Sequence, residues 1–200
     1  MKEDLSRVLS GKRALWIGLL LFAALLVGGQ ARSGEKVESL PDVLLVDRAG
    51  NERHLFSEIT GDRTVVMNFI FTDCSAACPI STAIMKSVRT RLNGQGDSGK
   101  SVVLVSVSIN PWADTPQRLA EFARRHGATG KGWFWLTGAQ REVDRLLLAA
   151  HSYTAEASEH PSVILIGRPD VGQWTPLYGF PKAEAILDQV ARYQGKEAMR

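Results

Sequence analysis

Two cysteines, Cys74 and Cys78, carry the most evident chemistry in this 200-residue sequence, which contains no other cysteine. Three residues separate them, and Pro79 follows the second. A loop of this length can bring two Cα atoms within the roughly 4.4–6.8 Å that a disulfide requires, or place both sulfurs around a metal ion. The pair can therefore form a redox-active dithiol, a structural disulfide or part of a metal site.

The cysteines lie where a predicted strand gives way to a predicted helix. Residues 64–71 form an almost continuous apolar, β-rich run, typical of a strand covered on both faces. Pro79 suits the first turn of a helix, and apolar residues then recur at helical spacing. The N-terminus of such a helix stabilises a thiolate through its unpaired N–H groups and its dipole. We expect Asp73 to cap this helix, with tuning of the thiol pKa as the alternative role.

The residue types favour two of the three possible chemistries. Two thiolates are soft ligands that select Cu(I), whereas a structural zinc site usually has four protein ligands. A structural disulfide is the alternative, since such bridges persist in exported proteins with an even number of cysteines. However, a bridge that closes so small a loop removes little chain entropy. A Cu(I) site and a thiol redox site are therefore the favoured interpretations.

The remaining pattern predicts an α/β fold. Residues 43–46 and 53–56 flank a turn-forming cluster and predict an N-terminal β-hairpin. Further strands are predicted over residues 101–109, 132–136, 162–166 and 174–177, and further helices over 115–126, 139–150 and 181–193. This alternation predicts βαβ units and a largely parallel sheet with helices on both faces. The closing β-β-α order is that of a thioredoxin-like fold, whose central sheet is mixed and flanked by helices.

Residues 1–31 are predicted to be a signal peptide or membrane anchor. Four Lys or Arg residues precede or border an apolar run from Ala14 to Val27, which is shorter than the roughly 20 residues that span a bilayer. Small residues at Gly29 and Ala31 suit cleavage after Ala31. We therefore expect a thioredoxin-like domain over residues 32–200, located in the periplasm or on the outer face of the cytoplasmic membrane.

Net charge gives no reason to expect a nucleic-acid partner. The formal charge of the chain is +3, but residues 1–31 contribute two of these positive charges. The remainder has twenty Lys or Arg residues against nineteen Asp or Glu residues. Nucleic-acid binding needs basic residues clustered on one surface. We therefore predict no nucleic-acid binding.

Residues 37–193 resemble the Sco/SenC family of copper metallochaperones, which have a thioredoxin fold with a C-x-x-x-C-P loop and a distant histidine. The resemblance rests on Asn68–Pro79, Asn110–Pro116, Trp133–Gly138, and His160 before Val163–Gly167. It implies that Cys74, Cys78 and His160 ligate copper, as Cu(I) or Cu(II). The implied role is delivery of copper to, or reduction of the thiols of, the binuclear copper site during cytochrome c oxidase assembly.

The partners implied by this resemblance are a copper-accepting subunit of cytochrome c oxidase or another copper protein, and a periplasmic thiol reductant. The sequence departs from the family pattern at two places, and the second departure supports an alternative function. Family members usually have an acid where this chain has Asn110, and here Pro161 follows His160 directly. A His-Pro pair before a strand resembles the cis-proline loop of thioredoxins, which keeps metal from the active cysteines. The alternative is a metal-independent periplasmic thiol-disulfide oxidoreductase that uses Cys74 and Cys78 as its catalytic pair.

Other readings are weaker. The Pro-x-x-x-Thr-x-x-Cys pattern of thiol peroxidases is absent, and a non-enzymatic exported binding module stays open. His54 and His126 are expected to be solvated or structural, and His151 is a substitute ligand only if His160 is not one. Most tryptophans are expected in the core, with Trp112 the best candidate for exposure.

Overall fold

The computed structural model describes residues 37–97 and 99–195, so the predicted leader at 1–31 lies outside the described part. Its sheet has eight strands in the order β1-β8-β7-β4-β5-β6-β2-β3. Three strands pair in parallel at its centre: β4 (Thr64–Ile70), β5 (Val102–Ser108) and β6 (Trp133–Gly138). The mixed sheet is as predicted, but the expectation of a largely parallel sheet is wrong, because every other pairing is antiparallel.

Antiparallel strands complete both sides of the sheet. On one side β7 (Val163–Arg168) pairs with β4, β8 (Gln173–Tyr178) with β7, and the short β1 (Val37–Glu38) with β8. On the other side lies the predicted hairpin, β2 (Leu44–Asp47) with β3 (Glu52–His54), and β2 pairs with β6. The Asp47 carboxylate accepts the backbone N–H groups of Ala49 at 2.8 Å and Asn51 at 3.0 Å, which closes the hairpin turn. The short π-helical segment Leu55–Thr60 that follows was not expected.

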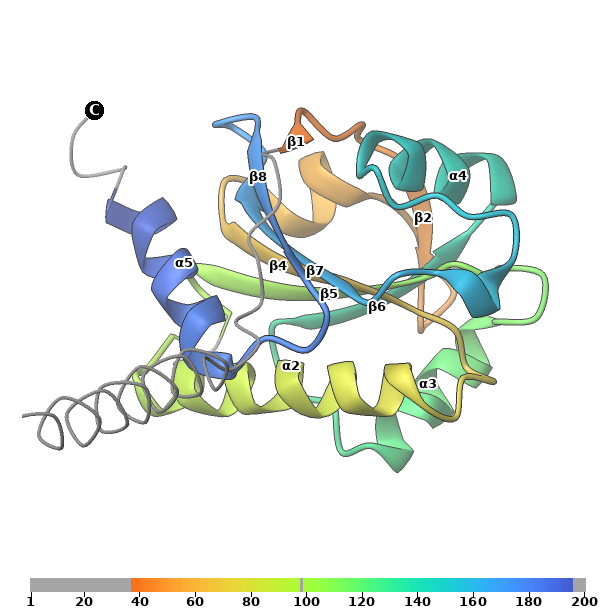
Figure 1. Ribbon diagram of the computed structural model, residues 1–200, viewed down its shortest axis with the longest axis horizontal. Coiled ribbons are helices and arrows are strands. Elements are labelled where there is room, and N and C mark those ends of the chain that lie inside the picture. The colour runs from red at the N-terminus through yellow and green to blue at the C-terminus, as the bar shows by residue number, and fades with distance from the viewer. Residues whose placement is uncertain (1–36, 98, 196–200) are drawn as a thin grey trace, which may run out of the picture. The chain divides into compact units, whose positions relative to one another are not determined.

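Helices cover both faces of the sheet (Figure 1). One face is covered by α2 (Ala77–Gly94), α3 (Pro116–Arg125) and α5 (Ala183–Gly195), and the other by α4 (Gln140–Ala149). The Thr115 hydroxyl accepts the Arg118 N–H at the start of α3, so the predicted helix start at Thr115-Pro116 is confirmed. None of the helices in the described ranges is long and apolar enough to cross a membrane.

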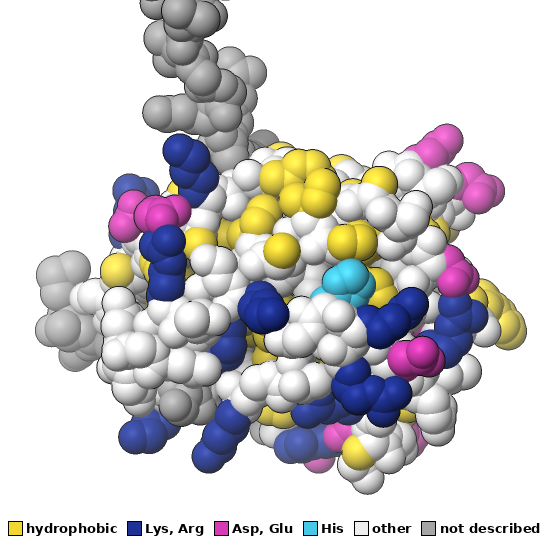
Figure 2. Space-filling view, turned by 90° about the horizontal axis from the view of Figure 1, so that it is seen from below, with side chains coloured by type: hydrophobic (Ala, Val, Ile, Leu, Met, Phe, Trp, Pro, Cys, Tyr) yellow, Lys and Arg dark blue, Asp and Glu magenta, His cyan; other side chains and the backbone are white. Residues whose placement is uncertain are grey.

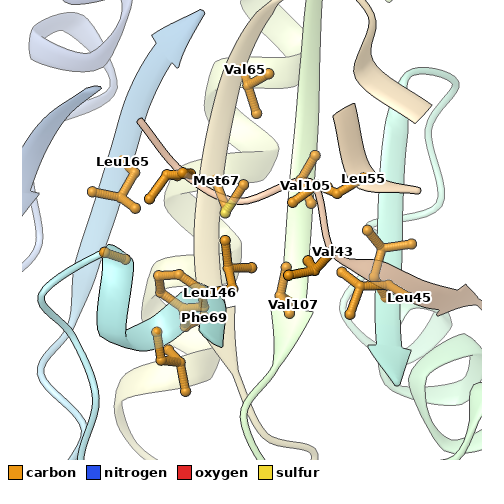
Figure 3. Packing of buried hydrophobic residues seen from close by; sticks show 14 of the residues in the cluster. Val43, Leu45, Leu55, Val65, Met67, Phe69, Val105, Val107, Leu146 and Leu165 are labelled. Atoms are coloured by element: carbon orange, nitrogen blue, oxygen red, sulfur yellow. The ribbon is translucent and has the colours of Figure 1, made fainter. Parts of the chain in front are cut away.

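The strand that leads to the cysteines alternates between two cores. Val65, Met67 and Phe69 pack on the α4 side (Figure 3), whereas Val66 and Ile70 pack on the side of α2. Side chains of a strand point to opposite faces in turn, so a strand covered on both faces must be apolar throughout. All seven residues of β4 are buried. The long apolar run in the sequence therefore reflects the central position of β4.

The surface is uneven in charge and has one prominent aromatic side chain. Lys and Arg side chains are spread over much of the face on which α2 and α3 lie (Figure 2). The exposed basic residues of these two helices include Lys86, Arg124 and Arg125. Trp112 is 85% exposed in the loop between β5 and α3, whereas Trp133, Trp135 and Trp174 are buried. Both tryptophan expectations are confirmed.

Candidate functional site

The two cysteines lie in the first turn of α2 and the loop before it. The Cys74 N–H donates to the Phe71 carbonyl at 3.2 Å, which folds the loop back after β4. The Cys78 N–H in turn donates to Cys74 Sγ at 3.2 Å. The first N–H groups of a helix have no partner within the helix, so this sulfur takes the place of a capping oxygen. Both cysteines are free thiols, with Cys74 partly exposed and Cys78 only 6% exposed.

The environments of the two thiols drive their pKa values in opposite directions. Partial burial opposes ionisation of Cys74, but hydrogen bonds from the Cys78 thiol and from the N–H groups of Ala76, Ala77 and Cys78 outweigh it and lower its pKa. Deeper burial, together with the hydrogen bond to Cys74, raises the pKa of Cys78 to about 12. Cys74 is therefore the thiol that ionises first, and Cys78 is its protonated neighbour.

The predicted cap at Asp73 is wrong. Its carboxylate pairs with the Arg118 guanidinium of α3, and α2 has no side-chain cap. The loop is fixed instead by a residue to which the sequence assigned no role. Asp114 is 1% exposed and accepts the Thr72 N–H at 3.1 Å, the Thr72 hydroxyl, and the Ser108 hydroxyl at 2.6 Å. In the sequence, Asp114 stands out only as part of the segment Asn110–Pro116, just before the Thr-Pro start of α3.

A second buried polar group holds Cys78. The Ser81 hydroxyl donates to the Cys78 carbonyl at 3.2 Å and accepts from the Asn68 side-chain amide at 3.2 Å. The side-chain oxygen of Asn68, Oδ1, accepts a hydrogen bond from the Ser106 hydroxyl at 2.7 Å. These bonds connect α2 to β4 and β5 through the core. They explain why the apolar strand β4 contains one asparagine.

His160 and the two cysteines line the same cavity. The cavity has a volume of about 370 Å³. One side, which we term the cysteine wall, is formed by Phe71, residues 73–78 and Ser81, and the other, the histidine wall, by Ala157, Ser158, His160 and Ser162. Phe69 of β4 also lines the cavity and contacts the imidazole edge-on, with ring centroids 5.5 Å apart. The structure thus brings the three predicted ligands to one cavity.

The imidazole of His160 is held neutral. Burial lowers its pKa to about 4, with a backbone contact from Pro161 opposing this shift. A neutral imidazole keeps a lone pair for a metal ion. Nε2 lies 3.1 Å from the hydroxyl oxygen of Ser152, a residue that the sequence did not single out.

The donors share a cavity without forming a completed cluster. Within residues 37–97 and 99–195, no three His, Cys, Asp or Glu side chains are already gathered closely enough to hold a metal ion. Two thiol sulfurs and an imidazole nitrogen nevertheless match what Cu(I) prefers. The assignment of Cys74, Cys78 and His160 as copper ligands therefore stays a prediction.

The cis-proline resemblance does not hold in the structure. The peptide bonds of the described residues are all trans, including the one between His160 and Pro161. Pro161 is also not among the residues that line the cavity.

The other histidines lie away from the cavity. His54 is close to Asp42, at 3.9 Å, and His126 ends α3 with its ring against Phe122. His151, the substitute candidate, is exposed just beyond α4 and does not line the cavity.

A dithiol at the start of the helix that follows a central strand, in a mixed sheet with helices on both faces, defines a thioredoxin-like protein. The profile of the SCO1/SenC family matches residues 35–174. The chain therefore belongs to the SCO1/SenC family, and the resemblance seen in the sequence is confirmed.

Individual relatives agree with this assignment. The chain is 29% identical to the SCO1 protein homolog of Bacillus subtilis (strain 168) over 110 residues, which is 52% of this chain and 55% of that protein. The chain spans about half the length of the curated relatives that it matches. Among solved structures it resembles BsSco (22% identity, TM-score 0.67, 78% of this chain and 93% of that one) and Arabidopsis thaliana ScoI with copper bound (19% identity, TM-score 0.62, 80% and 99%).

Proposed function

We propose that this protein is a copper chaperone that acts in cytochrome c oxidase assembly and binds copper through Cys74, Cys78 and His160. The observation that carries the proposal is the cavity that an ionisable thiol, a second thiol and a neutral imidazole line together. Soft sulfur ligands with one nitrogen suit Cu(I) far better than magnesium, and a structural zinc site would have a fourth protein ligand.

The relatives support both parts of this proposal. BsSco is a member of the Sco family of cytochrome c oxidase assembly proteins and has a disulfide switch. Arabidopsis thaliana ScoI was solved with copper bound. We accordingly take the partner to be a copper-accepting subunit of cytochrome c oxidase or another copper protein. The protein would bind this partner in the periplasm or at the outer face of the cytoplasmic membrane.

The same thiols can reduce a partner disulfide. The Cys74 thiolate attacks one partner sulfur, a mixed disulfide forms, and the other partner sulfur leaves as a thiolate. Cys78 then gives up its proton to that thiolate and attacks Cys74 Sγ, which releases the second partner sulfur. The partner gains two electrons, Cys74 and Cys78 become a disulfide, and a periplasmic thiol reductant must restore them.

Titration with Cu(I) against a chromophoric chelator tests the copper proposal. The reduced domain should bind one equivalent, Cys74→Ala should abolish tight binding, and His160→Ala should weaken it by at least about tenfold. His151→Ala is the matched control, because that histidine is exposed and outside the cavity. Failure of the reduced wild-type protein to bind copper would contradict the proposal.

One observation favours a second candidate, a metal-independent thiol-disulfide oxidoreductase. The opposed pKa shifts of Cys74 and Cys78 are those of an attacking thiol and a resolving thiol, and they need no metal. This function predicts reduction of a disulfide peptide under copper chelation, at equal rates in the wild type and in His160→Ala. Loss of that reduction on chelation would contradict it.

A further inference from the structure

A buried hydroxyl lies behind the imidazole of His160. Ser152 is 2% exposed, and its oxygen is 3.1 Å from Nε2. Ser152 does not line the cavity, whereas His160 does. Nε2 of the ring therefore lies against a buried hydroxyl that is not part of the cavity lining.

The end of α4 places this serine. His151 adopts a left-handed conformation with φ of +51°, and its N–H donates to the Leu148 carbonyl at 3.1 Å. The next N–H, that of Ser152, donates to the Leu147 carbonyl at 2.9 Å. These two bonds form a Schellman motif, a helix ending in which glycine usually takes the left-handed position. The motif reverses the chain and buries Ser152 directly after the exposed His151.

The protonation chemistry of imidazole makes this contact informative. A neutral ring carries one N–H, which donates, and one lone pair on the other nitrogen, which accepts or binds a metal. Metal-binding histidines almost always donate their second nitrogen to an acceptor, which fixes the tautomer and the ring orientation. A serine oxygen can act as this acceptor. The edge contact with Phe69 further restricts rotation of the ring.

We propose that Ser152 is a positioning residue for copper binding: its hydroxyl oxygen accepts the Nε2–H proton of His160 and leaves the lone pair on Nδ1. The inference rests on the proposed copper function of the same cavity. The Pro161 carbonyl also hydrogen-bonds the ring, and it can only accept a proton. It would select the opposite tautomer if it bound Nδ1–H.

The experiment reads the tautomer and the copper affinity separately. Nitrogen-15 NMR of the histidine side chains, in the reduced copper-free full chain, should show His160 protonated on Nε2. Ser152→Ala should give a mixture of tautomers and lower Cu(I) affinity about tenfold, and Ser152→Thr should restore both. Thr154→Ala is the control, since it removes a hydroxyl from the same segment that bonds only the Glu156 carbonyl.

Two results would overturn the inference. One is a wild-type His160 protonated on Nδ1, and the other is a Ser152→Ala protein with unchanged tautomer and unchanged Cu(I) affinity. Thermal unfolding of each variant, with Ser152→Thr as reference, separates an effect on the ring from general loss of the fold. Because the tautomer is read without copper, failure of the wild type to bind copper would count against the proposed function alone.

Discussion

The two walls of the cavity are held by very different interactions. Buried hydrogen bonds hold the cysteine wall in place. Asp114 accepts the N–H and the hydroxyl of Thr72, and the Ser81 hydroxyl donates to the Cys78 carbonyl. On the histidine wall, the imidazole of His160 meets one buried hydroxyl, one aromatic edge and the Pro161 backbone. One wall is anchored in the sheet, and the other is carried by a loop after α4.

This difference shows how the work of the site is divided. A buried hydrogen-bond network that is fully satisfied rigidifies the elements it joins, so the thiols keep one geometry. The three donors share the cavity without an assembled cluster in the described residues. The pKa values of the two thiols therefore depend on the cysteine wall itself. The position of the imidazole depends on the loop after α4.

The first way to break this contrast is Asp114→Ala, which should cost about 3–5 kcal/mol of unfolding free energy. The substitution leaves the buried N–H and hydroxyl of Thr72 and the hydroxyl of Ser108 without their acceptor, and each such group costs about 1–3 kcal/mol. Urea unfolding of the reduced protein measures the loss.

The matched control is Ser162→Ala on the histidine wall, whose hydroxyl donates to the Gly179 carbonyl at the surface. It should cost less than about 1 kcal/mol. Similar losses of unfolding free energy for Asp114→Ala and Ser162→Ala would show that the two walls are equally stabilised. That result would contradict the proposed difference between the two walls.

The fold was largely predictable from the sequence, because its signals are local. The run over residues 64–71 is apolar throughout since β4 is central, and the Thr-Pro pair at 115–116 starts α3 with a hydroxyl cap. The pairing of the hairpin strand β2 with β6 was not predictable, since it joins residues about ninety positions apart. Nor was the two-residue strand β1, which is too short to leave a pattern.

The reactive residues of the site were predictable from the sequence, but the residues that hold them in place were not. The thiol pair at a strand-to-helix junction identified Cys74 and Cys78 directly, and His160 came from the family resemblance. Asp114 and Ser152 act through burial and distance, which a single sequence does not display. Asp73 was misjudged as a cap because proximity to the helix start says nothing about Arg118, forty-five residues later in the chain.

The second test uses acid, and its expected effect is roughly 2 kcal/mol. The unfolded chain binds the His160 proton with a pKa near 6.5 and the folded chain with a pKa of about 4. The unfolded state therefore takes up more protons as the pH falls. Stability present at pH 7 should be lost progressively toward pH 4 and level off below it.

His160→Gln supplies the comparison, because glutamine does not titrate in this range. Urea unfolding of both copper-free proteins at pH 7.0, 5.5 and 4.5 should show wild type losing about 2 kcal/mol more than the variant. The other histidines are common to both proteins and cancel. Parallel losses in the two proteins would mean that the histidine wall admits the charged imidazole without cost.

The smallest expected effect is that of Asp73→Ala, at most about 0.5 kcal/mol. The Asp73 and Arg118 side chains are 63% and 42% exposed, and exposed ion pairs contribute little. A capping residue would instead cost about 1 kcal/mol, so a double-mutant cycle with Arg118→Ala separates the two roles. If Asp73→Ala costs 1 kcal/mol or more while Arg118→Ala costs nothing, Asp73 caps α2 after all. If Asp73→Ala and Arg118→Ala each lower the free energy of unfolding by the same small amount, the Cys74 sulfur is the acceptor at the start of α2. The cysteine wall is then supported mainly by the buried hydrogen bonds of Asp114.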